Sequence, residues 1–417
     1  MFKKETLANG VRIVTEEIPY VRSVSIGIWV GAGSRDEDEN NNGVAHFIEH
    51  MMFKGTAKRT AKDIAETLDA VGGQLNAFTS KEYTCYYAKV LDEHLDIAID
   101  LLSDMLFNSS FREDDLEKEK NVVIEEIKMY EDAPDELVHD IFASTLWSDH
   151  ALGRPVIGSE KIIKGLDREA VVGFKNRFYG PDSIVVAVAG NIKHDLVVSK
   201  LAPLFSAINQ QPEAKNFSAP KTSSRVYSRK KETEQVHLCV GTPGLPLDHP
   251  DSYVLHVMNS VMGGGLSSRL FQEIREERGL AYSIYTYHSS YKDAGLFSIY
   301  AGLSRSNLNQ VMDLVSKEMR NLRIKGITKD ELVRTKEQLK GSIFLGLENV
   351  SSRMTRLGKS ELCLNRVMTI EEVVDRINKV TLDEVRDLAG KFFRSENIVV
   401  SSVGPELDKK EFNVLLD

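Results

Sequence analysis

Alternating hydrophobic and polar positions predict β-strands in the first half of the chain. A pair of strands is expected at residues 11–14 and 23–30, and aliphatic side chains occupy every second position over most of the latter. A longer β-rich run covers residues 74–90. The continuous apolar run at residues 184–189 predicts a buried strand.

Helical spacing of the apolar residues predicts the elements between these strands. A polar loop at residues 36–43 precedes the first helix, and the pair Gly72-Gly73 ends the second. The expected helices cover residues 44–54, 61–71, 93–107 and 113–131. The first half of the chain therefore mixes strands with helices.

The second half of the chain resembles the first. Residues 309–315 have a pattern of residue types similar to that of residues 96–102, and residues 331–336 resemble residues 115–120. An internal repeat of this kind predicts two similar α+β domains. At 417 residues the chain is also too long for a single core.

The domain boundary is expected where the periodic pattern stops. Residues 209–224 contain Gln-Gln-Pro, Ala-Pro and Ser-Ser but no regular apolar spacing, which is typical of a linker. We therefore expect an N-terminal domain at residues 1–208 and a homologous C-terminal domain at residues 225–417.

The composition excludes several classes of function. A net charge of −9 speaks against nucleic acid as a partner, although an acidic surface would suit basic peptides or only solubility. The chain begins without a signal-peptide pattern and has no apolar run of about 20 residues, so no membrane insertion is expected. Three widely spaced cysteines fit a reducing compartment, and a cytoplasmic protein is expected.

The most informative motif lies on the first predicted helix. His46 and His50 are four residues apart, so both imidazoles project from one face of the helix, at a spacing that suits two nitrogen ligands of one zinc ion. Glu49 lies on the same face, where its carboxylate can reach a water molecule. His-x-x-Glu-His is the inverzincin signature. The alternative, that both histidines are ordinary helix residues, stays open on the motif alone.

A third ligand is expected from the helix at residues 113–131. Glu119 and Glu126 fall on its apolar stripe, whereas Glu125 lies on its polar face. Unpaired carboxylates are costly on a buried face and therefore favour a compensating cation. We predict Glu126 as the ligand and Glu119 as an acceptor that orients a histidine; a solvated helix face is the alternative. In the register of the repeat, Thr335 and Ser342 replace these two carboxylates in the second half.

Residues 42–56, Asn-Gly-Val-Ala-His-Phe-Ile-Glu-His-Met-Met-Phe-Lys-Gly-Thr, resemble the zinc helix of the pitrilysin, insulin-degrading enzyme and mitochondrial processing peptidase family. The likeness is greatest to its short, two-domain bacterial processing proteases. It implies that Glu126 completes the metal site and that Glu119 matches a second family glutamate. One Zn²⁺ per chain is expected, although cobalt or manganese stays open. The expected fold class is α+β, with two similar domains, each a mainly antiparallel sheet covered by helices, related by an internal duplication.

The resemblance also implies residues that contact the substrate. Residues 76–80, Asn-Ala-Phe-Thr-Ser, resemble the family's edge strand, on which a substrate peptide adds as an extra strand. Asn76, Ala77 and Phe78 are the residues expected to bind the peptide. Arg275 and Tyr282 resemble the pair that grips the substrate and stabilises the reacting carbonyl. Whether these two act within one chain or across a dimer stays open.

The expected function is that of a zinc metalloendopeptidase with Glu49 activating the attacking water. Its substrates would be unstructured peptides or presequence-like segments, cleaved inside a closed chamber formed by a homodimer. The main alternative is a non-catalytic or partner-dependent subunit of a heterodimeric processing peptidase. A structural zinc module is a further alternative, but such sites usually have four protein ligands, often cysteines.

Overall fold

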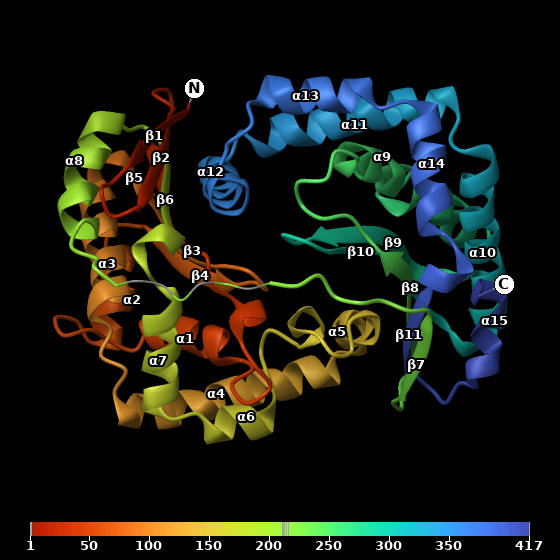
Figure 1. The fold of residues 1–417 in the computed structure, drawn as a ribbon, viewed down its shortest axis with the longest axis horizontal. Coiled ribbons are helices and arrows are strands. Elements are labelled where there is room, and N and C mark those ends of the chain that lie inside the picture. Colours follow the sequence, from red (N-terminus) through yellow and green to blue (C-terminus); the bar gives the residue numbers. More distant parts are fainter. Residues whose placement is uncertain (1, 211–212, 214, 216, 417) are drawn as a thin grey trace. The chain divides into compact units, whose positions relative to one another are not determined.

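The computed structural model describes residues 2–210, 213, 215 and 217–416. The chain divides into two compact units, each built from three segments (Figure 1). Unit 1 consists of Met1–Ile127, Pro155–Asn216 and Phe344–Met368. Unit 2 consists of Lys128–Arg154, Phe217–Ile343 and Thr369–Asp417.

Unit 1 contains a six-stranded sheet of order β1-β2-β6-β3-β5-β4. Its strands are β1 (Phe2–Thr6), β2 (Arg12–Glu17), β3 (Ser23–Val30), β4 (Gln74–Thr79), β5 (Thr84–Leu91) and β6 (Ile184–Gly190). Neighbouring strands are antiparallel except β2 and β6, which are parallel. The expected pair at residues 11–14 and 23–30 therefore exists as β2 and β3, but β6 lies between them.

Helices cover both faces of this sheet. The larger apolar cluster joins one face of the sheet to residues of α1, α2, α3, α4, α6, α7 and α8, and a smaller cluster joins the other face to α12. In β6, alternate residues belong to the two clusters, which agrees with the expected buried strand. The helices are α1 (Val44–Met52), α2 (Ala61–Asp69), α3 (Leu95–Asn108), α4 (Glu113–Asp132), α6 (Glu160–Gly165), α7 (Arg168–Phe178), α8 (His194–Phe205) and α12 (Val350–Leu364).

Unit 2 repeats this architecture with a five-stranded sheet of order β7-β11-β8-β10-β9. Its strands are β7 (Arg225–Lys230), β8 (Gln235–Pro243), β9 (Ala281–Ser290), β10 (Gly295–Ser304) and β11 (Val399–Gly404). Again a single neighbouring pair, β7 and β11, is parallel. Taken in chain order, the strands of unit 2 follow the same arrangement as β2 to β6 of unit 1, which agrees with an internal duplication.

The helices of unit 2 are also divided between the two faces of its sheet. One apolar cluster includes residues of α9, α10, α11, α14 and α15, and another joins the opposite face to α5. The helices are α5 (Pro134–Leu146), α9 (Ser252–Gly263), α10 (Leu308–Lys325), α11 (Lys329–Gly346), α13 (Ile370–Lys379), α14 (Leu382–Phe392) and α15 (Asn413–Leu416).

The compact units differ from the contiguous domains expected at residues 1–208 and 225–417. Each unit takes one helix from the other half of the sequence, because α5 packs on β8 and β11 whereas α12 packs on β3 and β6. The chain passes from unit 1 to unit 2 within the expected linker, residues 209–224, of which residues 211, 212, 214 and 216 lie outside the described residues.

Complementary side-chain sizes explain why the helices are exchanged. A Cβ atom on Gly358 of α12 would lie 2.1 Å from Nε1 of Trp29, so the indole covers a position where only glycine fits. In unit 2 the sizes are reversed, and a Cβ atom on Gly241 of β8 would lie 2.6 Å from the ring of Phe142, as well as 2.1 Å from the carbonyl oxygen of Phe297 on β10. Phe142 and Gly358 are each the ninth residue of their helix. With α5 over Trp29, two large rings would compete for one space.

Candidate metal centre

The helix α1 is anchored at its N-terminus by a buried carboxylate. Glu37 accepts hydrogen bonds from the backbone N–H groups of Gly43 (2.8 Å) and Ala45 (2.7 Å) and from the side chain of Asn42 (2.8 Å). A negative charge at this end also interacts favourably with the helix dipole. Gly43 has φ +100°, and a Cβ atom there would lie 2.8 Å from the carbonyl oxygen of Ile157. The start of α1 is therefore fixed in space.

The structure brings His46, His50 and Glu126 together. Oε2 of Glu126 lies 3.8 Å from Nε2 of His46 and 3.4 Å from Nε2 of His50. These separations exceed ordinary N–H···O hydrogen bonds, which are about 2.7–3.2 Å. Tetrahedral ligands at about 2.0–2.1 Å from a zinc ion lie about 3.3–3.4 Å from one another. The separations of the three side chains are therefore closer to those of ligands around one metal ion than to those of hydrogen bonds between the side chains.

Glu119 contacts one of the two histidines and a lysine. Its Oε1 lies 2.9 Å from Nδ1 of His50, and its Oε2 lies 2.6 Å from Nζ of Lys54. A hydrogen bond at Nδ1 leaves Nε2 of His50 as the ligand atom. Glu119 is 3% exposed, so a carboxylate buried this deeply depends on both partners. Nδ1 of His46, in contrast, has no hydrogen-bond partner among the described residues.

The two histidines of this cluster differ in pKa. Burial lowers the pKa of His46 to about 4, and the neighbouring charge of His50 acts in the same direction. Burial also acts to lower the pKa of His50, but the carboxylates of Glu119 and Glu126 outweigh it and raise that pKa to about 9. The two carboxylates thus attract a positive charge into the site, which a divalent cation would supply.

Glu49 is held from a neighbouring strand. The hydroxyl of Thr79, the last residue of β4, donates a hydrogen bond of 2.5 Å to Oε2 of Glu49. Burial raises the pKa of Glu49, and the hydrogen bond from Thr79 partly opposes that shift. Glu49 therefore lies on the same helix as the two histidines, with its carboxylate tied to the sheet.

The predicted substrate residues Asn76, Ala77 and Phe78 lie on β4. This strand is the last in its sheet and pairs only with β5. Asn76 is exposed, whereas Ala77 and Phe78 are partly buried. The Phe78 ring packs against Trp29, with ring centroids 5.6 Å apart. One edge of β4 therefore remains without a partner strand among the described residues.

Arg275 and Tyr282 belong to unit 2, where the structure brings them together. Arg275 lies in a π-helical turn, Phe271–Glu276, and Tyr282 is the second residue of β9. Gly279, at φ +60°, reverses the chain between them, and its N–H donates to the carbonyl oxygen of Arg275. The guanidinium carbon of Arg275 lies 4.9 Å from the Phe271 ring centroid and 5.8 Å from that of Tyr282. Both predicted residues are exposed on this unit.

Sequence patterns missed three residues that support the site. Thr79 lies within the segment predicted as an edge strand, but its contact with Glu49 depends on how α1 packs against the sheet. Lys54 stands four residues after His50, and this helical spacing could have placed it near Glu119. Glu37 lies in the polar loop before α1, where an acidic residue is a signal for a helix start.

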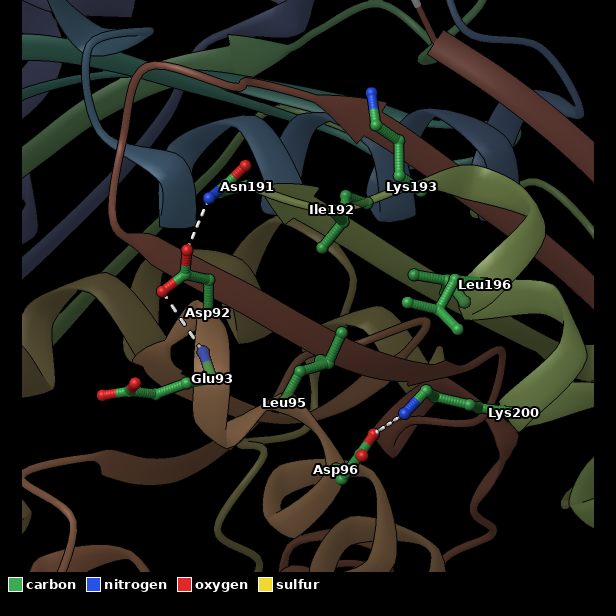
Figure 2. Close-up of a pocket in the computed structure, with 10 residues that line it drawn as sticks. Asp92, Glu93, Leu95, Asp96, Asn191, Ile192, Lys193, Leu196 and Lys200 are labelled. Carbon is green, nitrogen blue, oxygen red and sulfur yellow. Dashed lines mark hydrogen bonds and ion pairs between the residues drawn. The ribbon is translucent and has the colours of Figure 1, made fainter.

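A separate pocket of about 210 Å³ in unit 1 is a weaker candidate. Figure 2 shows that Asp92 and Asp96, which line it, each bind another lining residue. Asn191 donates a hydrogen bond to Asp92 (2.5 Å), and Lys200 pairs with Asp96. Ligand pockets are usually larger, about 300–1,000 Å³. This pocket therefore offers neither the volume nor the uncommitted polar groups of a binding site.

Among the described residues, His46, His50 and Glu126 form a group that could hold a metal ion. Within the part of the chain that the structure describes, no other set of three His, Cys, Asp or Glu side chains brings its ligand atoms within 4.8 Å of one another. The three cysteines are free, so no disulfide joins them. Among these same described residues, no helix combines the length and apolar character needed to cross a membrane.

A helix with His-x-x-Glu-His and a glutamate on a second helix is the arrangement of the inverzincin class of metallopeptidases. Comparison with known families agrees with this class. The profile described as Insulinase (Peptidase family M16) matches residues 12–160, and that described as Peptidase M16 inactive domain matches residues 165–339. The chain belongs to peptidase family M16, which confirms the predicted family.

Similarity to known proteins extends over nearly the whole chain. The uncharacterized zinc protease YmxG of Bacillus subtilis is 47% identical over 405 residues, which cover 97% of this chain and 98% of that protein. An uncharacterized zinc protease of Streptomyces coelicolor is 44% identical over 416 residues, covering 98% of this chain and 90% of the relative. Relatives with these names agree with the predicted peptidase.

Solved structures confirm the fold. A peptidase M16 inactive domain from Pseudomonas fluorescens superposes with a TM-score of 0.89 at 21% identity, over 98% of each chain. A protease from Helicobacter pylori also gives a TM-score of 0.89 at 21% identity, over 97% of this chain and 99% of that one. The expected α+β fold with two similar domains is therefore confirmed.

Proposed function

We propose that this chain is a zinc-dependent metalloendopeptidase of the cytoplasm that hydrolyses unstructured peptides or presequence-like segments. The observation that carries the proposal is the convergence of His46 Nε2, His50 Nε2 and Glu126 Oε2, with separations of 3.8 and 3.4 Å from the glutamate oxygen. These three side chains would hold one Zn²⁺. When bound, zinc would polarise the scissile carbonyl and lower the pKa of a water molecule toward about 7.

The chain's own residues would move the protons. Glu49 would accept a proton from the attacking water at its carboxylate and transfer it to the leaving amine. Its position one residue before His50 places it beside the metal ligands on the same helix. Glu119, at 2.9 Å from Nδ1 of His50, would fix the ring orientation of that ligand.

The substrate would bind as an extended peptide. The unpaired edge of β4, at Asn76 to Phe78, offers backbone N–H and C=O groups that recognise a peptide with little regard to its sequence. Arg275 and Tyr282 would donate hydrogen bonds to the reacting carbonyl or to the substrate backbone. We further propose that two chains form a homodimer that encloses a chamber, so that flexible peptides enter and folded proteins do not.

A peptidase assay tests the proposal. The purified chain would be incubated with a quenched, unstructured basic peptide, with and without a zinc chelator, beside Glu49→Gln. We expect cleavage that both the chelator and the substitution abolish, while the variant retains its zinc. A zinc-loaded wild type that cleaves nothing would favour the alternative, a partner-dependent subunit. Cleavage that survives Glu49→Gln would refute the proposed role of Glu49.

A further inference from the structure

The contact between Thr79 and Glu49 joins the proposed metal helix to the proposed substrate strand. The hydroxyl of Thr79 lies 2.5 Å from Oε2 of Glu49. The neighbouring hydroxyl of Thr84, 3.5 Å from that of Thr79, donates to the carbonyl oxygen of Ala32 at 2.9 Å. Thr84 is thus committed to the backbone, which leaves the proton of the Thr79 hydroxyl directed to Glu49.

The end of β4 is held rigidly in place. The backbone N–H of Ser34 donates to the carbonyl oxygen of Ser80 (3.1 Å), and that of Arg35 donates to Lys81 (2.7 Å). Arg35, which is 4% exposed, also pairs with Glu82 at 2.6 Å. The turn after Thr79 is therefore fixed by the loop at residues 33–35.

The same loop continues into the residue that anchors the metal helix. Glu37 follows Arg35 by two residues and accepts the first free N–H groups of α1. One short segment therefore fixes both the start of α1 and the end of β4. The backbone positions of α1 and β4, which carry Glu49 and Thr79, are therefore linked through this segment.

When a hydrogen bond fixes one oxygen of a carboxylate, the direction of its second oxygen is also defined. A glutamate side chain on a helix surface normally samples several rotamers, and a general base acts only from the one that reaches the proton. A hydrogen bond from a rigid strand selects one rotamer before substrate arrives. The orientation of Glu49 would thus be part of the folded structure.

We propose that Thr79 is a positioning residue that orients the Glu49 carboxylate, and that it places the proposed catalytic base and the substrate-binding edge of β4 on one rigid frame. This inference rests on the proposed function, because it assigns Glu49 to proton transfer. In this proposal Thr79 acts through Glu49, with which it shares a hydrogen bond of 2.5 Å. A purely structural tie between α1 and β4 would instead affect stability without changing the chemical step.

Four variants separate these roles. Thr79→Val removes the hydroxyl at nearly constant volume, and Thr79→Ser restores it. Thr286→Val is the matched control, because Thr286 is a buried threonine on the edge strand β9 whose hydroxyl donates to the backbone oxygen of Asn259 at 2.9 Å. Glu49→Gln sets the level expected when the base is lost. For each protein, kcat, KM, zinc content and the melting temperature are measured.

We expect Thr79→Val to lower kcat by about 10- to 100-fold, a part of the 10²- to 10⁴-fold effect typical of a general base, with KM within about threefold of wild type and zinc content unchanged. Thr79→Ser should recover most of kcat, and Thr286→Val should keep the wild-type kcat. The inference is overturned if Thr79→Val keeps kcat, raises only KM, or loses zinc. It is also overturned if Thr79→Ser is as slow as Thr79→Val.

Crystal structures of the zinc-loaded wild type and of Thr79→Val decide the inference independently of activity. We expect the Glu49 carboxylate to occupy one orientation in the wild type and to turn away or split between orientations in the variant. An identical carboxylate in both would overturn the positioning role, whatever the assay gives. An inactive, zinc-loaded wild type would refute the proposed function, and the two crystal structures would then still test the orientation.

Discussion

The two compact units share one architecture but differ in what their equivalent helices carry. Glu119 and Glu126 are the seventh and fourteenth residues of α4, and Thr335 and Ser342 hold the same places in α11. Thr335 is as buried as Glu119, since each is 3% exposed. The fold is therefore built equally well with a hydroxyl at this position. At these two positions carboxylates occur only in the unit that also has the two histidines, which favours a role for them in the candidate metal site rather than in the fold.

The contacts between helix and sheet also differ between the units, because the large ring and the glycine change places. Unit 1 has its large ring on the sheet, Trp29, and its glycine on the helix, Gly358. Unit 2 has its large ring on the helix, Phe142, and its glycine on the sheet, Gly241. Duplicated units with equal contacts could accept either helix. This reversal makes each sheet selective for the helix from the other half of the chain.

Removing the carboxylate of Glu126 is expected to give the largest effect. Glu126→Gln replaces a charged oxygen ligand with a weakly coordinating amide, so zinc affinity should fall by at least about 100-fold, and peptide cleavage with it. Metal analysis after dialysis against a zinc buffer measures the first, and the quenched-peptide assay measures the second.

Two matched variants test whether this effect belongs to unit 1 alone. Glu125→Gln alters the adjacent, exposed residue of α4, and Ser342→Ala alters the equivalent position of α11. Each is expected to keep the wild-type zinc content and rate. Zinc loss in Ser342→Ala, or full zinc binding by Glu126→Gln, would contradict the assignment of the metal to unit 1.

Enlarging Gly358 should destabilise unit 1. Gly358→Ala places a Cβ atom 2.1 Å from Nε1 of Trp29, and overpacking of this kind costs about 1–3 kcal/mol. Denaturant unfolding of the variant and wild type measures the loss. Gly390→Ala in α14 is the control, because its Cβ atom would meet nothing within 4 Å and alanine favours helix. A Gly358→Ala protein as stable as wild type would refute the size complementarity as the reason for the exchange.

Local patterns predicted much of the fold and of the metal centre. Helical periodicity alone placed Glu119 and Glu126 on one stripe, and the four-residue spacing placed His46 and His50 on one face. Residues on one face of a helix are only a few positions apart in the sequence, so their relation can be predicted from the sequence alone. The repeat of α4 in α11 was predicted for the same reason.

Contacts between distant segments were not predictable in this way. The insertion of β6 between β2 and β3 depends on a crossover from more than a hundred residues away. The exchange of α5 and α12 depends on Trp29 meeting Gly358, and nothing near either residue signals the other. Arg275 and Tyr282 were named only through a family resemblance, although Gly279 between them marks the turn that joins them.

Weakening the orientation of His50 should give a smaller effect than losing a ligand. Glu119→Gln replaces the carboxylate that accepts from His50 and pairs with Lys54, so zinc affinity should fall by about 10- to 100-fold. Competition with a chromogenic chelator measures the affinity. Thr335→Val, at the same place in α11, should alter stability only. Wild-type zinc affinity in Glu119→Gln would show that the negative charge beside Nδ1 contributes nothing to metal binding, because the amide oxygen of glutamine can still accept that hydrogen bond.

The start of α11 should give unit 2 a dependence on acidic pH through Glu331. Glu331, the third residue of α11, accepts two hydrogen bonds from Arg269 (2.7 and 2.8 Å) and one from the N–H of Thr328 (2.7 Å). At Asp115, the third residue of α4, Nζ of Lys118 lies 3.5 Å from the carboxylate. Burial acts to raise the pKa of Glu331, but Arg269 and Thr328 outweigh it and lower that pKa from 4.5 to about 2.

Because this folded-state pKa lies below the unfolded value, the stabilisation from Glu331 is complete above about pH 4.5 and is lost as the pH falls toward 2. Glu331→Gln should therefore lower the free energy of unfolding by about 1–2 kcal/mol at pH 7, allowing for solvent screening, and by much less at pH 3. Asp115→Asn should cost about 0.5 kcal/mol or less at pH 7. Calorimetric unfolding of both variants at the two pH values measures these differences. Equal losses at pH 7 and pH 3 for Glu331→Gln would mean that its ionised form does not stabilise unit 2, and the contrast between the two helix starts would then be one of shape alone.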